Sequence, residues 1–179
     1  MKGLFILILF FLTSFVNGQI TYDNLEMLRN MGMGEIEEYL VSRNWNVKQI
    51  EEKTDFTGSS ISFTLDNKKS IDYLTVTETE YYNEEGKRLN GYNRINLGTS
   101  DKILYLSILN RIKNLKFILT KTKIEKDKLK KLYKHNNIAI SISINNIIID
   151  ELHDPVPFYI IFIANNKDFE MFFEFKEFL

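Results

Sequence analysis

Residues 138–144 read Ile-Ala-Ile-Ser-Ile-Ser-Ile, and this stretch decides the class of fold. Isoleucine at every second position, with small or polar residues between, is typical of a strand with one face on a core and one in water. Similar strand patterns occupy 115–124, 129–135 and 158–164. The last of these is apolar on both faces, which predicts a strand near the middle of a sheet.

A helix is expected before these strands, because the apolar period changes from two to about 3.6 residues. Ser100 is the expected cap. The predicted buried stripe consists of Leu104, Tyr105, Ile108, Leu109 and Ile112. At the other end, residues 168–179 carry Glu170, Glu174 and Glu177 as one polar stripe, which predicts a C-terminal helix packed across a sheet.

The same order of patterns occurs earlier in the chain. Helices are expected around Leu25 and Leu28, with Asp23 or Asn24 as cap, and around Ile36 and Leu40. Strand patterns follow at 45–49, 61–65, 71–82 and 92–97. We therefore predict an α+β fold of two tandem units, 19–98 and 99–179. Each would be a helix followed by about four antiparallel strands, and the two would form one compact body.

Residues 1–18, MKGLFILILFFLTSFVNG, have the form of a signal peptide. Lys2 precedes an unbroken apolar run of nine residues, and Gly18 suits cleavage before Gln19. The alternative, a membrane anchor, needs about 20 apolar residues, more than this run supplies. We expect export, with no integral membrane segment once the leader is removed. No Asn begins a glycosylation sequon, and residue usage is that of an AT-rich genome, which favours a bacterial source.

Several kinds of chemistry are excluded or disfavoured by composition. The absence of cysteine excludes disulfides and a thiol nucleophile, and the chain has neither a G-x-S-x-G elbow nor a P-loop. Asp150, Glu151, His153 and Asp154 carry metal-ligand chemistry, but without an EF-hand or H-E-x-x-H pattern they are interpreted as a solvated acidic loop that ends at Pro155 and Pro157. We expect no metal, no cofactor and no catalytic residue from these patterns.

Acidic doublets leave a hydrolase open as an alternative. Such an enzyme needs two carboxylates held at a fixed separation by different elements. The doublets, however, fall where acidic side chains are simply solvated: Glu37/Glu38, Glu51/Glu52 and Glu84/Glu85.

Charge is distributed very unevenly along the chain. The whole sequence has a net charge of −1, yet residues 111–135 carry ten basic and two acidic side chains. The candidate binding residues are the lysines of this predicted hairpin, Lys121, Lys123, Lys126, Lys128, Lys130 and Lys131. They fit docking to an acidic protein or an anionic surface, or else the protection of strand edges against aggregation. Lysine outnumbers arginine without interleaved aromatics, which disfavours nucleic-acid recognition.

The leader, the run LRNMGMGEIEEYLVSRNWNV at 28–47 and the Tyr-Lys-x-Asn-Asn turn at 133–137 resemble small exported proteins of Bacteroidota. The resemblance implies tandem helix-plus-sheet units with a junction from Tyr39-Leu40 to Trp45, and assigns no activity. The order of elements is also similar to that of beta-lactamase-inhibitor-like proteins. The chain lacks the glycine-rich ending expected of cargo for the outer-membrane sorting system of that phylum, which favours the periplasm.

The sequence thus favours a non-enzymatic binding or inhibitor-like module in the bacterial periplasm. Its expected surface is the exposed sheet face together with the basic hairpin. The alternatives are a carboxylate-dependent hydrolase and an immunity-type protein against a periplasmic toxin.

Overall fold

The computed structural model describes residues 19–53, 58–67, 70–82, 88–126, 128–148 and 155–170. Its helices there are α2 (Tyr22–Leu28), α3 (Met33–Val41), α4 (Lys102–Asn114) and α5 (Asn166–Phe169). Its strands are β1 (Asn46–Glu51), β2 (Ser60–Asn67), β3 (Ser70–Thr77), β4 (Glu80–Tyr82), β5 (Arg88–Asn90), β6 (Arg94–Thr99), β7 (Ile118–Glu125), β8 (Lys128–His135), β9 (Ile138–Ile147) and β10 (Val156–Asn165).

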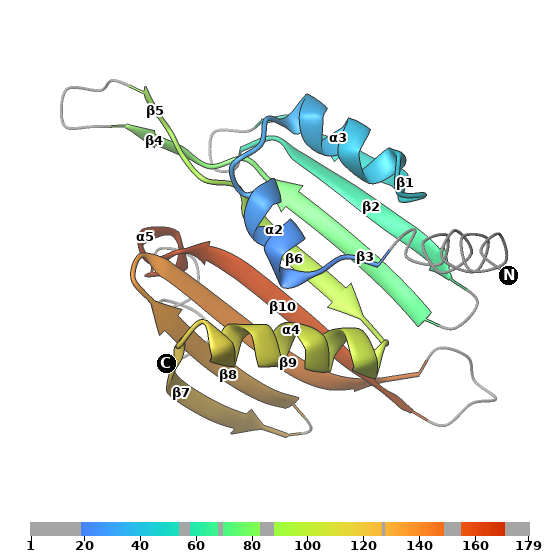
Figure 1. Ribbon diagram of the computed structural model, residues 1–179, viewed down its shortest axis with the longest axis vertical. Coiled ribbons are helices and arrows are strands. Elements are labelled where there is room, and N and C mark those ends of the chain that lie inside the picture. Colours follow the sequence, from blue (N-terminus) through green and yellow to red (C-terminus); the bar gives the residue numbers. More distant parts are fainter. Residues whose placement is uncertain are drawn as a thin grey trace, which may run out of the picture.

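Eight of the strands form one antiparallel sheet in the order β1-β2-β3-β6-β10-β9-β8-β7. In Figure 1, β6 and β10 run side by side through its middle, while β4 and β5 form a separate two-stranded ribbon at one end. The central place predicted for 158–164 is confirmed, because β10 has partners on both sides.

The α+β class is confirmed, but the predicted division into two units of one helix and four strands is wrong. The described chain before α4 holds two helices and six strands. Strand β6 pairs with β10 from Ile95↔Ile163 to Thr99↔Tyr159, so both halves contribute to a single sheet. One apolar cluster likewise contains side chains from α2, α3, α4 and strands of both halves.

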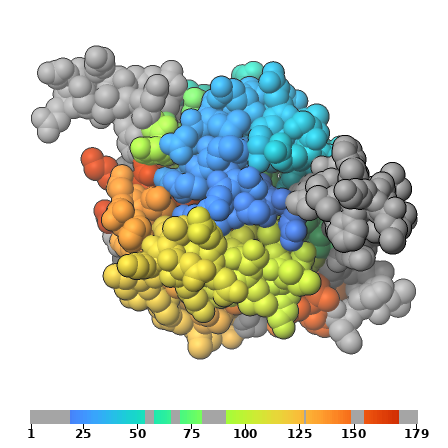
Figure 2. All heavy atoms as spheres, viewed as in Figure 1, coloured from blue at the N-terminus to red at the C-terminus, as the bar shows by residue number. Residues whose placement is uncertain are grey.

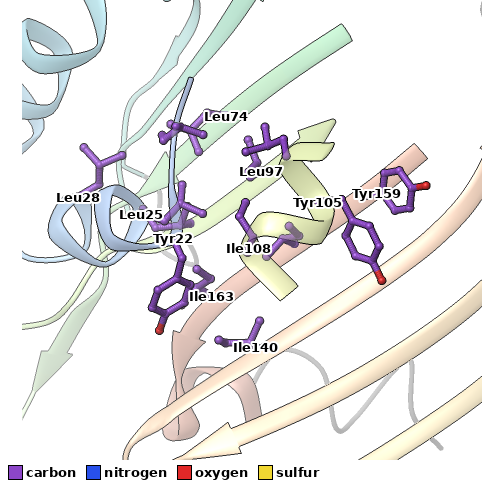
Figure 3. Close-up of a cluster of buried hydrophobic side chains, with 14 of the residues drawn as sticks. Tyr22, Leu25, Leu28, Leu74, Leu97, Tyr105, Ile108, Ile140, Tyr159 and Ile163 are labelled. Atoms are coloured by element: carbon purple, nitrogen blue, oxygen red, sulfur yellow. The ribbon is translucent and has the colours of Figure 1, made fainter. Parts of the chain in front are cut away.

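Helices α2, α3 and α4 cover one face of the sheet (Figure 1), and in Figure 2 the atoms of α2 and α4 adjoin above it. Between the helices and the sheet lies the core, where Figure 3 shows Leu25 and Ile108 pointing toward strand side chains such as Leu97 and Ile163. Tyr105 of α4 stacks on Tyr159 of β10, with ring centroids 4.1 Å apart. All five residues of the stripe predicted for α4 are buried.

Helix starts differ from the prediction by one or a few residues. Thr21 caps α2, since its hydroxyl accepts the Asn24 backbone N–H at 3.2 Å while Asn24 Oδ1 accepts the Thr21 N–H at 2.9 Å. Asp101 caps α4 through Oδ1, which accepts the backbone N–H groups of Ile103 and Leu104. Ser100 does not cap α4, because its hydroxyl oxygen instead accepts the backbone N–H of Ile71.

The sheet face opposite these three helices is called the outer face below. Here Tyr73 of β3 lies across Gly98 of β6, where a Cβ atom would come within 2.0 Å of the Tyr73 ring. A small second cluster on this face joins Leu132, Ala139 and Phe169, with Phe162 packed against it. Of the C-terminal helix predicted over 168–179, the first two residues belong to α5, and residues 171–179 lie outside the described part.

No helix in the described ranges combines the length and the apolar character that are needed to cross a membrane. The leader and its cleavage position at Gly18 and Gln19 lie partly outside those ranges.

Candidate binding site on the outer face

The structure divides the six predicted lysines between the two faces of the sheet. Cross-strand partners share a face, so the pairs Lys121↔Leu132, Lys123↔Lys130 and Glu125↔Lys128 all project from the outer face. Lys131 is opposite Thr122 and therefore projects from the other side. Four of the six lysines thus share the outer face.

Lys126 lies in the turn that joins β7 to β8, with a backbone φ of 52°. This turn places it beyond the paired part of the hairpin. Lys134, which was not among the predicted residues, projects from the outer face as well and approaches Glu170 at 3.6 Å.

The carboxylate of Glu125 lies close to two of these lysines. Glu125 Oε1 is 2.5 Å from Lys123 Nζ, and Glu125 Oε2 is 3.6 Å from Lys130 Nζ. The hydrogen bond from Lys123, together with the charges of both lysines, lowers the pKa of the Glu125 carboxyl. The Lys130 side chain is only 12% exposed, so its alkyl stem is held along the sheet.

A groove of about 260 Å³ follows β9 beside these lysines. Small residues of β9 form its floor, with lysines of β8 on one side and apolar residues of β10 on the other. Its lining is Asn96, Lys128, Lys130, Ser141, Ser143, Asn145, Ile160 and Phe162.

The groove lining includes two amide oxygens that accept no hydrogen bond from the described residues. Asn96 Oδ1 and Asn145 Oδ1 are buried, and neither has a hydrogen-bond partner in the part of the chain that the structure describes. A buried acceptor without a partner costs about 1–3 kcal/mol. Such groups commonly mark places where water or a ligand completes the structure.

A second hollow, of about 220 Å³, lies where α2 ends, and Arg29, Glu78 and Asn93 are in its lining. Arg29 is 2% exposed; Nη1 binds Glu26 at 2.9 Å and Nη2 donates to Asn165 Oδ1 at 2.5 Å. The Asn93 amide donates to the carbonyls of Leu28 and Met31 at the end of α2. These contacts anchor α2 to the sheet, and we assign this arginine a structural role.

The chain also buries a carboxylate that the sequence analysis missed. Asp72 is 5% exposed and accepts hydrogen bonds from the hydroxyls of Thr99 at 2.5 Å and Ser70 at 3.0 Å. Burial raises the pKa of Asp72, the two hydroxyls oppose this, and the charge of Asp101 adds to it. The signal in the sequence is the spacing: Asp72 lies two residues before Leu74 and four before Val76, so it shares the buried face of the strand with them.

The structure describes only some of the other acidic and histidine candidates. Glu51 and Glu52 are exposed, and Glu84/Glu85 and the 150–154 cluster lie outside the described residues. His135 packs against Phe117, with ring centroids 5.2 Å apart. Within the described ranges, no group of three or more acidic or histidine side chains has the arrangement that a metal ion needs.

Comparisons with models of protein families, with curated protein sequences and with solved structures gave no match.

Proposed function

We propose that the protein is a non-enzymatic binding module that holds an acidic partner protein against the outer face beside the β7–β8 hairpin. The observation that carries the proposal is the shared face of Lys121, Lys123, Lys128 and Lys130, next to a groove of about 260 Å³. In the described part of the hairpin, Glu125 is the acidic side chain that lies among these lysines. A cationic surface next to a hollow suits an acidic protein surface that has a protruding segment.

The competing interpretation is that the lysines only protect a strand edge. Edge protection requires charge along the exposed strand, β7. It does not require Lys128 and Lys130 to line a groove one strand further in. This second row of lysines favours binding.

A comparison of two charge-neutralised proteins separates these interpretations. In the first, the six hairpin lysines at 121, 123, 126, 128, 130 and 131 are changed to Gln. In the matched control, six exposed lysines outside the hairpin are changed to Gln at 48, 53, 102, 113, 116 and 167. Both lose the same charge.

Each protein is tagged and used to capture partners from its native host at low and high salt. We expect the control to retain the partner and the hairpin variant to lose it, with retention falling as salt rises. A partner that the hairpin variant keeps to the same extent as the control would reject the proposal.

We also propose that the protein is exported to the bacterial periplasm after cleavage between Gly18 and Gln19. The support is the leader's short basic start and its apolar run of nine residues. Fractionation of the native host, with N-terminal sequencing, tests this: the expected result is a periplasmic chain beginning at Gln19. A chain that still begins at Met1 would contradict it.

A further inference from the structure

The groove on the outer face has a direction, because its floor belongs to one strand. Ser141, Ser143 and Asn145 are alternate residues of β9 and project from the same side. At about 3.3 Å per residue, Ser141 to Asn145 spans about 13 Å. This length matches four or five residues of an extended peptide.

The two walls of the groove differ in chemistry. On the β8 side, Lys130 is the cross-strand partner of Ser143, and Lys128, two residues before it on β8, also lines the groove. On the β10 side, Ile160 is the partner of Ser143, and Phe162 is the partner of Ser141. The cationic wall therefore begins beside Ser143, the apolar wall runs beside Ser141 and Ser143, and the two walls face each other at Ser143.

The hydroxyl-bearing floor is low, because serine side chains are short beside lysine, isoleucine and phenylalanine. An extended backbone has room between the walls, and its side chains alternate in direction with a period of two. Successive residues of such a peptide would meet the lysine wall and the apolar wall in turn.

We propose that this groove binds an extended peptide segment in which acidic and large apolar residues alternate. The inference rests on the proposed function, and it names the part of the acidic partner that the outer face recognises. The carboxylates pair with Lys128 and Lys130, while the apolar side chains pack on Ile160 and Phe162. Asn96 and Asn145, whose amide oxygens have no hydrogen-bond partner among the described residues, supply side-chain amides for the backbone of the peptide.

Binding is measured by fluorescence anisotropy with labelled eight-residue peptides and the purified protein. The first peptide alternates Glu and Leu. The second has the same composition with the four Glu and the four Leu in two blocks. The third alternates Lys and Leu. We expect the alternating acidic peptide to bind at least tenfold more tightly than either of the others.

Three protein variants test the walls and the floor. The double charge reversal Lys128→Glu with Lys130→Glu is expected to lower the affinity for the alternating Glu-Leu peptide at least tenfold. The same variant is expected to bind the Lys-Leu peptide more tightly than the original protein does. The control, Lys102→Glu with Lys113→Glu, makes the same change of charge on the exposed side of α4 and is expected to leave affinity within twofold. Ser143→Phe fills the floor and is expected to abolish binding.

Circular dichroism and thermal melting establish that each variant is folded. Equal binding of the alternating and blocked peptides, or unchanged binding by folded Ser143→Phe, overturns the groove inference. If the six-lysine Gln variant still loses the native partner, the proposed function stands without the groove. If that variant keeps its partner, the proposed function fails independently of the peptide result.

Discussion

Two helix-to-strand junctions of this protein have the same geometry and almost no residues in common. Helix α3 passes into edge strand β1 through Asn44 and Trp45, and α4 passes into edge strand β7 through Lys116 and Phe117. Asn44 and Lys116 have positive φ angles of 66° and 62°. The aromatic residue that follows each is buried.

The hydrogen bonds of the two junctions also match. Trp45 N–H donates to the Leu40 carbonyl at 3.1 Å, and Phe117 N–H donates to the Ile112 carbonyl at 3.2 Å. Asn44 and Lys116 each donate to the carbonyl three residues earlier. This is the Schellman ending of a helix, which turns the chain sharply and brings the next apolar residue back onto the helix.

Both edge strands then carry a register irregularity at the corresponding place, between Val47 and Gln49 in β1 and between Leu119 and Lys121 in β7. A bulge twists an edge strand and makes it a poorer template for pairing with another chain. The comparison shows that the chain uses the same junction geometry twice with different residues. Substitutions at equivalent positions of the two junctions should therefore change the free energy of unfolding by different amounts.

The largest expected effect is at the first aromatic residue. Trp45 is 2% exposed and is among the largest fully buried side chains of the described residues. Trp45→Ala should lower the free energy of unfolding by about 3–5 kcal/mol, because it removes a large apolar contact and leaves a cavity. Urea denaturation followed by circular dichroism measures it, and a loss below 2 kcal/mol would contradict the packing described.

A smaller loss is expected at the second aromatic residue. Phe117 is 8% exposed and packs between Tyr22, at 6.2 Å between ring centroids, and His135. Phe117→Ala should cost about 3 kcal/mol, the lower end of the range for buried aromatics. The same denaturation series tests the ranking, and a loss larger than that of Trp45→Ala would reverse the comparison.

The next difference lies at the start of the helix that leads into each junction. The capping residue of α3 is Gly32, whose N–H donates to Glu35 Oε2, whereas the capping residue of α4 is Asp101, whose charge acts on buried Asp72. The folded protein holds the Asp72 proton more tightly than the unfolded chain, since its pKa is raised from 3.8. Stability should therefore fall as the pH rises from about 3.8 through the folded-state pKa.

Asp72→Asn keeps one acceptor oxygen for the Thr99 hydroxyl, replaces the oxygen that accepts from Ser70 by an NH2 group, and removes this titration. We expect the variant to be more stable than the original protein at pH 7, with the advantage shrinking toward pH 4. Urea denaturation at several pH values between 4 and 8 checks the trend. Parallel pH profiles for the two proteins would show that Asp72 does not titrate as described.

The smallest effects on stability are expected at Asn44 and Lys116, the two junction residues with a positive φ angle. Asparagine tolerates positive φ, whereas lysine does so at a cost. Lys116→Gly should stabilise the protein by about 0.5–1 kcal/mol, while Asn44→Gly should change stability by less than about 0.5 kcal/mol. Melting temperatures of the two variants provide the test, and an equal gain at both positions would remove this distinction.

Periodicity in the sequence predicted the elements well where burial is one-sided. It identified the stripe of α4 from Leu104 to Ile112 and the alternation of Ile61 and Phe63, both of which are buried as expected. It did not predict how the halves join, because pairing between β6 and β10 depends on residues 60 or more positions apart.

The candidate site was predicted only in part for a related reason. The charge count located the β7–β8 hairpin, and the two-residue period already separates Lys130 from Lys131. The groove could not be predicted, because it needs Asn96 of β6 and Phe162 of β10 beside the hairpin. That neighbourhood is created by the sheet order rather than by any local pattern.

The central pairing of β6 with β10 has a consequence for the synthesis of the chain. Strand β10 is the last strand of the described sheet, yet it occupies a middle position. Synthesis starts at the N-terminus, so the sheet can begin to assemble from β1, β2, β3 and β6. Strand β6 then has an unpaired apolar edge until β10 has been made. A chain interrupted before residue 156 would keep that edge open to other molecules. The sheet is therefore complete only after β10 has been made, so incomplete chains should aggregate more readily than the full chain.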